Sequence, residues 1–295
     1  MTGDQLIKAL AYDDQVRIYL LDLTQAVNEG SRRHDMWHTA TAAYGRTLIA
    51  TALLAGNMKG DDRLTVQIEG TGPIGRILCQ GDAKGQVRGY VDQPHVALEL
   101  NKEGKLDVRG AVGLPGTLSV TKQLAVGEPF TGQVPLISGE LAEDFTYYMA
   151  VSEQTPSSIG LSVLVNPDET VRVAGGFMIQ VLPGATEETI TQLEQNIQKL
   201  GRFSSLLDSN QSLEDVMSYL ASDQDVRILS REPVTYHCPC NKEHFESRLV
   251  LLPADDLQQL IDEDEGAEVI CHYCNEHYQF TKEDLEEILK QKEAK

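Results

Sequence analysis

The sequence predicts a mixed α+β protein in three parts: an N-terminal α/β domain with an antiparallel or strongly bent sheet, a helical linker, and a small C-terminal domain. Three observations predict this. Short segments that alternate apolar and polar residues fill the first part, helical patterns without obvious strands follow, and four of the five cysteines stand in two tight pairs near the C-terminus. We place the domains at residues 1–183, 184–231 and 232–295.

The N-terminal domain mixes helices with many short strands. A strand is expected over 17–24, then an amphipathic stretch and a long helix over 37–56, which Gly56 and Asn57 end. Helix 139–154 and strands 159–166 and 171–182 complete the domain. The strands expected in between are RLTVQIEG (63–70), IGRILCQG (74–81), GQVRGYVD (85–92), KLDVRGAVG (105–113), GTLSVTKQL (116–124) and FTGQVPLI (130–137). This rhythm is typical of an antiparallel meander or a bent sheet.

The segment 184–231 is predicted to form short amphipathic helices. One begins near Thr186, and a second begins at Ser212, with Asp215 three residues later. Helices of this length are marginal in isolation and need a surface on which to lie. We therefore interpret the segment as a conditionally folded linker. A plain helical connector is the alternative.

The C-terminal domain is too small to have a large core. Helices are expected over 253–264 and 281–292, and a hairpin over 267–281 encloses the second cysteine pair. A module of this size usually needs a metal or a disulfide for stability.

The four paired cysteines form a CxC–x30–CxxC pattern: Cys238, Cys240, Cys271 and Cys274. Two clusters of soft thiolates are what a tetrahedral structural Zn²⁺ takes, and the second pair has the usual spacing of a zinc knuckle. The first pair is tighter than usual. We predict one Zn²⁺ held by these four cysteines. The histidines nearby, which can replace a sulfur, are His237, His244, His272 and His277.

Two catalytic or binding roles for the cysteines are less favoured. A thioredoxin-like thiol–disulfide oxidoreductase places its CxxC at the start of a helix, whereas a strand pattern follows Cys274. A nucleic-acid-binding zinc ribbon needs basic surface, whereas residues 232–295 carry 6 basic and 16 acidic groups. A constitutive, purely structural zinc module remains open as an alternative.

Oxidation offers a further use for the four cysteines. Zinc-bound sulfurs are thiolates, the form that oxidants attack, and each cysteine has a neighbour two or three positions away that can resolve a sulfenic acid. Loss of the four ligands would unfold a zinc-dependent module and remove support from the linker. The sequence therefore permits an oxidation switch that exposes hydrophobic surface.

The cysteine pattern resembles that of a known family, the 33 kDa chaperonins, which are redox-regulated bacterial heat-shock holdases. GTGPIGRI (70–77) and YMAVSEQTPSSIGLSVLV (148–165) are also similar to the N-terminal domain of that family. The resemblance extends over the whole chain, and none of the four cysteines departs from it.

The resemblance implies an ATP-independent chaperone that is not an enzyme. In the reduced form, the four cysteines would hold one Zn²⁺ and the protein would be inactive. Oxidants would join Cys238 to Cys240 and Cys271 to Cys274, release the metal and unfold the linker. The oxidised protein would form a homodimer and hold unfolding client proteins against aggregation.

The other features of the sequence indicate neither a membrane protein, nor a nucleotide-binding protein, nor a secreted protein. No apolar run approaches the roughly 20 residues needed to cross a bilayer, and the N-terminus lacks the features of a secretion signal, so we expect a cytoplasmic protein. The GxGxxG match at 70–75 is interpreted as a hairpin turn, because a strand pattern follows it where a nucleotide site needs a helix. Cys79, outside the motif, is expected to be a small buried residue.

Overall fold

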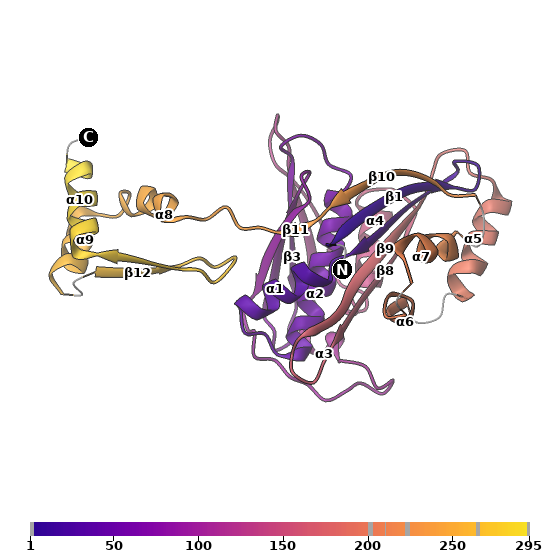
Figure 1. Ribbon diagram of the computed structural model, residues 1–295, viewed down its shortest axis with the longest axis horizontal. Coiled ribbons are helices and arrows are strands. Elements are labelled where there is room, and N and C mark those ends of the chain that lie inside the picture. The colour runs from indigo at the N-terminus through magenta and orange to yellow at the C-terminus, as the bar shows by residue number, and fades with distance from the viewer. Residues whose placement is uncertain (1–2, 200–202, 210, 222–224, 264–265, 294–295) are drawn as a thin grey trace. The chain divides into compact units, whose positions relative to one another are not determined.

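The computed structural model describes residues 3–199, 203–209, 211–221, 225–263 and 266–293. Parts of the expected linker, at 200–202, 210 and 222–224, therefore lie outside the described residues. The chain divides into two compact units, Met1–His237 and Cys238–Lys295, each of which is described by itself. Both mix helices with antiparallel strands, so the predicted α+β class is confirmed (Figure 1).

The first unit contains two sheets. A five-stranded sheet has the order β10-β1-β2-β9-β8, and a six-stranded sheet has the order β11-β5-β4-β3-β6-β7. The strands of the first sheet are β1 (Gln5–Ala11), β2 (Val16–Asp22), β8 (Ser157–Val165), β9 (Val171–Val181) and β10 (Arg227–Pro233). Those of the second are β3 (Arg63–Glu69), β4 (Arg76–Asp82), β5 (Gln86–Val91), β6 (Thr117–Gln123), β7 (Phe130–Pro135) and β11 (Thr235–Tyr236). All pairs are antiparallel except β11 with β5.

Helix α2 (His38–Ala55) packs against strands of both sheets and is buried on nearly all sides. Its composition of alanine, threonine and leucine suits that position, because small side chains permit close packing on every face. Ile49 of α2 lies so close to Gly176 of β9 that a Cβ at position 176 would come within 2.6 Å of it. Helices α1 (Thr24–Arg33) and α4 (Ala142–Val151) complete this core. The helix predicted over 37–56 is confirmed.

One predicted strand is wrong. Residues 105–113 contain the short helix α3 (Val108–Val112) and no strand. Asp107 caps the helix by accepting a hydrogen bond from the Gly110 amide at 2.9 Å. Val108, Ala111 and Val112 are buried, and their spacing is that of one helix face, so the apolar pattern was compatible with either structure.

The first sheet is buried on both faces. Leu6, Tyr19 and Leu21 face the core around α2. Ile7, Ile18 and Leu20, one position out of phase, face a second hydrophobic cluster. That second cluster is formed with the helices α5 (Glu187–Lys199), α6 (Phe203–Leu207) and α7 (Leu213–Leu220). The helical segment therefore leaves the sheet after β9 and rejoins it at β10, covering one face on the way.

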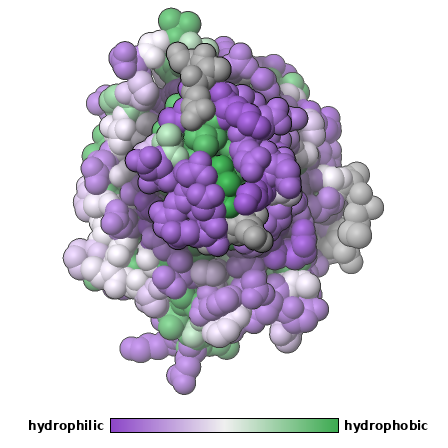
Figure 2. Space-filling model, turned by 90° about the vertical axis from the view of Figure 1, so that its left-hand side faces the viewer, coloured by the Kyte–Doolittle hydropathy of each residue, from purple (hydrophilic) through white to green (hydrophobic). Residues whose placement is uncertain are grey.

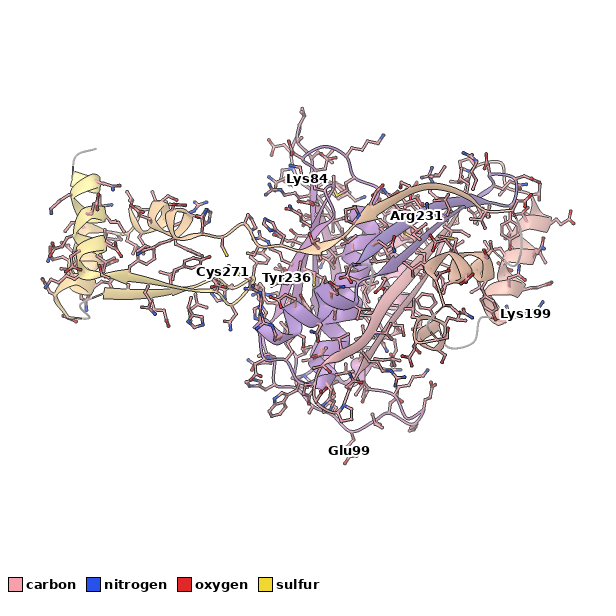
Figure 3. All side chains as sticks on the ribbon, in the orientation of Figure 1. Lys84, Glu99, Lys199, Arg231, Tyr236 and Cys271 are labelled. Carbon is pink, nitrogen blue, oxygen red and sulfur yellow. The ribbon has the colours of Figure 1, made fainter. Side chains whose placement is uncertain are left out.

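Strand β10 was not predicted, because the segment 184–231 showed no obvious strand. Its residues alternate between exposed and half-exposed positions, which leaves little hydrophobic signal. Pairing with β1, in which Lys8 lies opposite Ser230, supplies the hydrogen bonds that make it a strand. Arg231 of β10, which is labelled in Figure 3, also forms an ion pair with Glu214 of α7 at 2.9 Å.

The second unit is small. It contains α8 (Lys242–Leu249), α9 (Ala254–Asp262), the hairpin β12 (Gly266–Ile270) and β13 (His277–Thr281), and α10 (Lys282–Glu293). The hairpin and the helices α9 and α10 are as predicted, whereas α8 was not predicted. Among the described residues of this unit, the buried hydrophobic cluster has five members: Leu257, Ile261, Phe280, Leu285 and Ile288. So small a core gives this unit little stability of its own.

Candidate metal centre

The first cysteine pair lies between the last strand of the first unit and α8. His237 donates its backbone N–H to Val87 at 3.0 Å, and Cys238, Pro239 and Cys240 follow directly. Asn241 then caps α8, because its side chain accepts a hydrogen bond from the His244 amide at 2.7 Å. The cap fixes the backbone immediately after Cys240.

The second pair lies in the turn of the β12–β13 hairpin. The Cys271 carbonyl accepts hydrogen bonds from the amides of Cys274 at 3.3 Å and Asn275 at 2.7 Å, and the Cys271 amide donates to Glu276 at 2.9 Å. Asn275 has a φ of +56°, in the left-handed region that asparagine tolerates. This tight turn brings both sulfurs to the same side of the hairpin.

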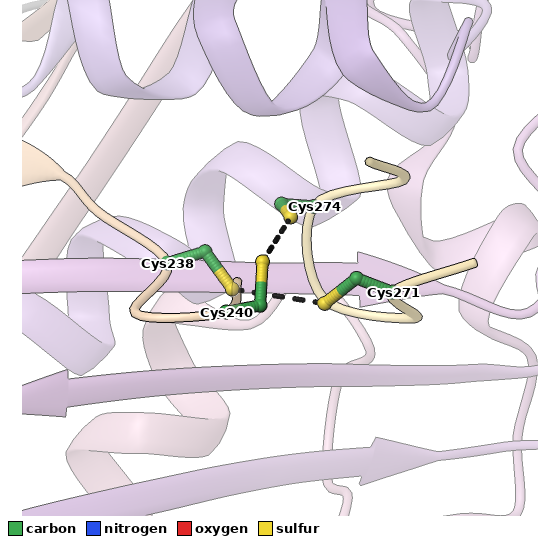
Figure 4. A group of neighbouring side chains, drawn as sticks. All are labelled: Cys238, Cys240, Cys271 and Cys274. Atoms are coloured by element: carbon green, nitrogen blue, oxygen red, sulfur yellow. Dashed lines mark hydrogen bonds between the residues drawn. The ribbon is translucent and has the colours of Figure 1, made fainter. Parts of the chain in front are cut away.

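The four sulfurs meet at one point (Figure 4). All four Sγ atoms lie within 4.8 Å of one another. The distance is 3.7 Å from Cys238 to Cys271 and 3.3 Å from Cys240 to Cys274. A tetrahedral Zn²⁺ with Zn–S bonds of about 2.3 Å would separate its sulfurs by about 3.8 Å. The donor set and its spacing therefore fit a closed Cys₄ zinc site.

The sulfur cluster is partly enclosed. Cys271 and Cys274 are buried, whereas Cys238 and Cys240 are half-buried. The Tyr278 hydroxyl donates a hydrogen bond to the Cys240 Sγ at 3.2 Å, and the Tyr278 ring packs on Phe245 with the ring centroids 5.1 Å apart. Donation to a ligand sulfur of this kind orients the ligand and tunes its charge. Sequence reasoning missed Tyr278, although its place on the strand after the CxxC turn was the available signal.

Burial determines the protonation of the inner sulfurs when no metal is bound. Burial raises the pKa of the Cys271 thiol, and burial together with the hydrogen bond to Cys240 raises the pKa of the Cys274 thiol. Both groups are therefore neutral thiols at pH 7 in the metal-free protein. Metal binding must displace their protons.

The nearby histidines stand outside the sulfur cluster. Across the described residues, the only group with metal-ligand geometry consists of the four cysteines. The Nδ1 atom of His277 lies 3.2 Å from the Glu268 carboxylate on the neighbouring strand, and the His244 ring packs edge-to-face with Phe245. The preference for cysteine ligands over histidine therefore agrees with the geometry.

The remaining sequence features have the expected structural roles. Cys79 on β4 is fully buried, and burial raises the pKa of its thiol, which makes it inert. Gly70–Gly75 forms the turn between the antiparallel strands β3 and β4, and no helix begins there. Among the described helices, none is long and apolar enough to cross a membrane.

The surface of the second unit is polar. The face of this unit seen in Figure 2 is mostly hydrophilic, with a narrow hydrophobic strip near its middle. This agrees with the many charged residues of the unit. The sequence shows that most of these charges are acidic, which is the opposite of what a surface that binds nucleic acid needs.

Comparison with known proteins gives one consistent family. The model of the family described as "Hsp33 protein" matches residues 4–281. The 33 kDa chaperonin of Bacillus subtilis is 52% identical over 283 residues, which cover 96% of this chain and 97% of that protein. The 33 kDa chaperonin of Enterococcus faecalis is 49% identical over 285 residues, which cover 97% and 96%. The crystal structure of the 33 kDa chaperonin of Thermotoga maritima superposes with a TM-score of 0.92 at 37% identity, and each chain is fully covered.

Proposed function

The chain belongs to the Hsp33 family, and we propose that its four cysteines, its helical segment and the sheet beneath that segment act together as an oxidation switch. The protein is a redox-regulated holdase chaperone with a four-cysteine zinc site, and it is not an enzyme. As a chaperone it acts on client proteins. The cluster of four sulfurs within 4.8 Å is the observation that carries the proposal.

In the reduced state, Cys238, Cys240, Cys271 and Cys274 each give one sulfur to a single Zn²⁺. The bound metal keeps the sulfurs as thiolates and joins two segments of the second unit that are thirty residues apart. Because the hydrophobic cluster of that unit has five buried members among the residues that the structure describes, which is a small core, metal binding provides much of the folding free energy of the unit.

Oxidation produces two local disulfides, Cys238–Cys240 and Cys271–Cys274. When each disulfide forms, its two thiols lose two electrons and two protons, so one hydrogen peroxide per pair is reduced to two waters. In the reduced arrangement two close sulfur–sulfur contacts, Cys238 to Cys271 and Cys240 to Cys274, run between the two pairs and not within them. Sequence neighbours nevertheless stay close after the metal leaves and the unit unfolds, which supports the local pairing.

The chain also divides by role into residues 1–183, 184–231 and 232–295. The helical segment covers one sheet face through Leu193, Val216, Met217 and Leu220, which pack on strand residues such as Ile18 and Phe177. Strands β10 and β11 lead from this segment to Cys238 without a further linker. Unfolding of the second unit therefore removes order from the chain next to β11.

Release of the helical segment exposes apolar surface on both partners. The sheet face loses its cover over Ile7, Ile18, Leu20 and Ile179, and the helices expose the residues that covered it. Contiguous apolar surface of this kind binds unfolded chains and also favours self-association. We therefore include client binding at this face and homodimer formation in the proposal.

The proposed location is the cytoplasm. None of the five cysteines forms a disulfide in the structure, and a reducing compartment keeps them as thiols in the absence of stress. An oxidation switch needs that reduced starting state.

One experiment tests the switch. A chemically unfolded client is diluted into reduced, zinc-loaded protein or into peroxide-treated protein at raised temperature, with a zinc-sensitive dye present, and light scattering is followed. We expect only the oxidised sample to suppress scattering, with release of about one zinc per chain. Equal suppression by both samples with zinc retained would make the site merely structural, and catalytic turnover of a small disulfide would make the protein an oxidoreductase.

A further inference from the structure

A cavity of about 510 Å³ lies in the first unit, where the ends of α2, α4, β2 and β9 come together. One wall is the turn Glu153–Pro156, which belongs to the conspicuous YMAVSEQTPSSIG stretch of the sequence. The size is within the range of pockets that hold small molecules. The oxidation switch makes no use of this cavity.

Arg17 brings a positive charge to the cavity. Its Nη1 contacts the Tyr19 hydroxyl at 3.4 Å, and its buried Nε has no hydrogen-bond partner among the described residues. A hydroxyl contact and an unpartnered nitrogen both leave the positive charge of the guanidinium without a neighbouring negative charge in the part of the chain that the structure describes. A planar guanidinium with unused donors is suited to a carboxylate, which it can bind through two parallel hydrogen bonds.

The other charges of the cavity cancel. Lys122 forms an ion pair with Glu153 at 2.5 Å, and the Tyr148 hydroxyl also donates to Glu153 at 2.5 Å. Lys122 and Glu153 are the remaining charged residues in the lining, so Arg17 leaves the cavity with a net positive charge. The cavity therefore selects for an anion.

Gln180 provides a second donor beside Arg17. Its side chain lines the cavity, and the residue is only 6% exposed. The hydrogen bond of its amide nitrogen among the described residues is a weak one, to the Met178 sulfur at 3.8 Å. Gln180 lies directly opposite Arg17 in the β2–β9 ladder, so the two side chains stand on the same face of the sheet. A buried amide without an oxygen or nitrogen partner is a site at which a ligand oxygen gains a hydrogen bond.

The rest of the wall is largely apolar, with Leu54 from α2, Met149 from the end of α4, and Leu182 after β9. We propose that the cavity binds a small monocarboxylate with an apolar chain. The carboxylate lies between Arg17 and Gln180, and the chain lies against Leu54, Met149 and Leu182.

The test uses the reduced, zinc-loaded full chain and sodium octanoate as the probe. Methionine methyl groups are labelled with ¹³C, and the Met149 methyl resonance is followed during titration. We expect a saturable shift with a Kd of about 0.1 to 1 mM. 1-Octanol, which has the same chain without the charge, is expected to bind at least about tenfold more weakly.

Variants separate charge recognition from simple apolar binding. Arg17→Gln is expected to weaken octanoate binding about tenfold or more, whereas Arg63→Gln, which removes an exposed arginine of β3, leaves it unchanged. If Arg17→Gln lowers the zinc content or the melting temperature, Arg17→Lys replaces it and is expected to bind with intermediate affinity. The proposal is overturned if Met149 shows no saturable shift, if octanol binds as tightly as octanoate, or if the Arg17 variants bind like the parent protein.

Discussion

The Tyr278 hydroxyl donates a hydrogen bond to the Cys240 Sγ across 3.2 Å. The contact joins β13, the second strand of the hairpin, to the first cysteine pair. It therefore holds a sulfur of the CxC pair, whose spacing is tighter than that of an ordinary zinc knuckle. A donor at this place orients the Cys240 sulfur as a metal ligand and, by sharing its lone pair, makes the sulfur a weaker nucleophile.

Tyr278→Phe is therefore expected to weaken zinc binding about tenfold and to speed peroxide oxidation, with zinc stoichiometry unchanged. Zinc release to a chromophoric chelator and the rate of thiol loss measure the two effects. Tyr219→Phe, at an exposed tyrosine of the first unit, serves as the matched control. Identical chelator kinetics in both variants would show that the hydroxyl contributes nothing to the site.

Removal of zinc by a strong chelator under reducing conditions is expected to unfold residues 238–295 while the core of the first unit persists. The reason is the hydrophobic cluster of the second unit, with its five buried members, which cannot offset the entropy of ordering the chain. Limited proteolysis followed by mass spectrometry measures this. Protection of the second unit equal to that of the zinc-loaded sample would contradict the expectation.

Zinc affinity is expected to rise with pH. Because burial raises the pKa values of Cys271 and Cys274, both are protonated at neutral pH in the metal-free protein and release their protons on binding. These two protons alone give an increase of about 100-fold in affinity per pH unit below those pKa values, and each further ligand thiol that loses a proton on binding adds about tenfold. Competition with a chelator between pH 6.5 and 8 measures the slope, and a slope below one proton would refute this account.

Leu220→Ala is expected to activate the chaperone without an oxidant. Leu220 is the last residue of α7 and is fully buried, and truncation of a buried leucine costs about 2–5 kcal/mol, which is large for so short a helix. Suppression of client scattering by the reduced, zinc-loaded variant measures the effect. Tyr219→Ala, at an exposed position of the same helix, is expected to remain inactive. A Leu220 variant whose helical segment is protease-sensitive but which still fails to bind clients would place the binding surface elsewhere.

Asp4 is expected to make the first unit less stable as the pH rises. Its carboxylate accepts hydrogen bonds from the amides of Gln25 at 2.9 Å and Ala26 at 2.7 Å, but burial outweighs them and raises the pKa to about 6. The folded state therefore favours the protonated acid. Its stabilising contribution is complete below the unfolded pKa of about 4 and is lost as the pH rises through 6, which amounts to about 2–3 kcal/mol.

The comparison that tests this is between the parent protein and Asp4→Asn. The side-chain amide does not titrate, and its single oxygen can accept a hydrogen bond from only one of the two backbone amides, which is a cost that does not change with pH. Because all other groups are shared, the difference in unfolding free energy between the two proteins isolates Asp4. We expect the variant to gain relative stability between pH 4.5 and 7.5, as measured by chemical denaturation, and a difference that stays constant with pH would contradict the raised pKa.

The sequence alone determined the features that depend on local chemistry. The spacing of Cys238, Cys240, Cys271 and Cys274 was enough to predict a cluster of four sulfurs. Two closely spaced cysteine pairs are the usual ligand set of a tetrahedral structural zinc site, and such a site brings the two pairs together. The helix start at Ser212 was equally local: Ser212 and Asp215 form the reciprocal hydrogen bonds of a capping box. The CxxC turn and its hairpin followed from strand alternation on either side.

Only the tertiary structure decided the features that depend on distant partners. Strand β10 exists because β1 supplies its hydrogen bonds, and its own half-exposed residues carry little hydrophobic pattern. Residues 108–112 have an apolar pattern that suits either a strand or a helix, and they form a helix because one helical face is buried in the core. Arg17 and Gln180 line the same cavity because β2 and β9, which are far apart in the sequence, pair in a register that places the two residues opposite each other. Such pairings are set by which edges and faces meet during folding, and no residue encodes its partner locally.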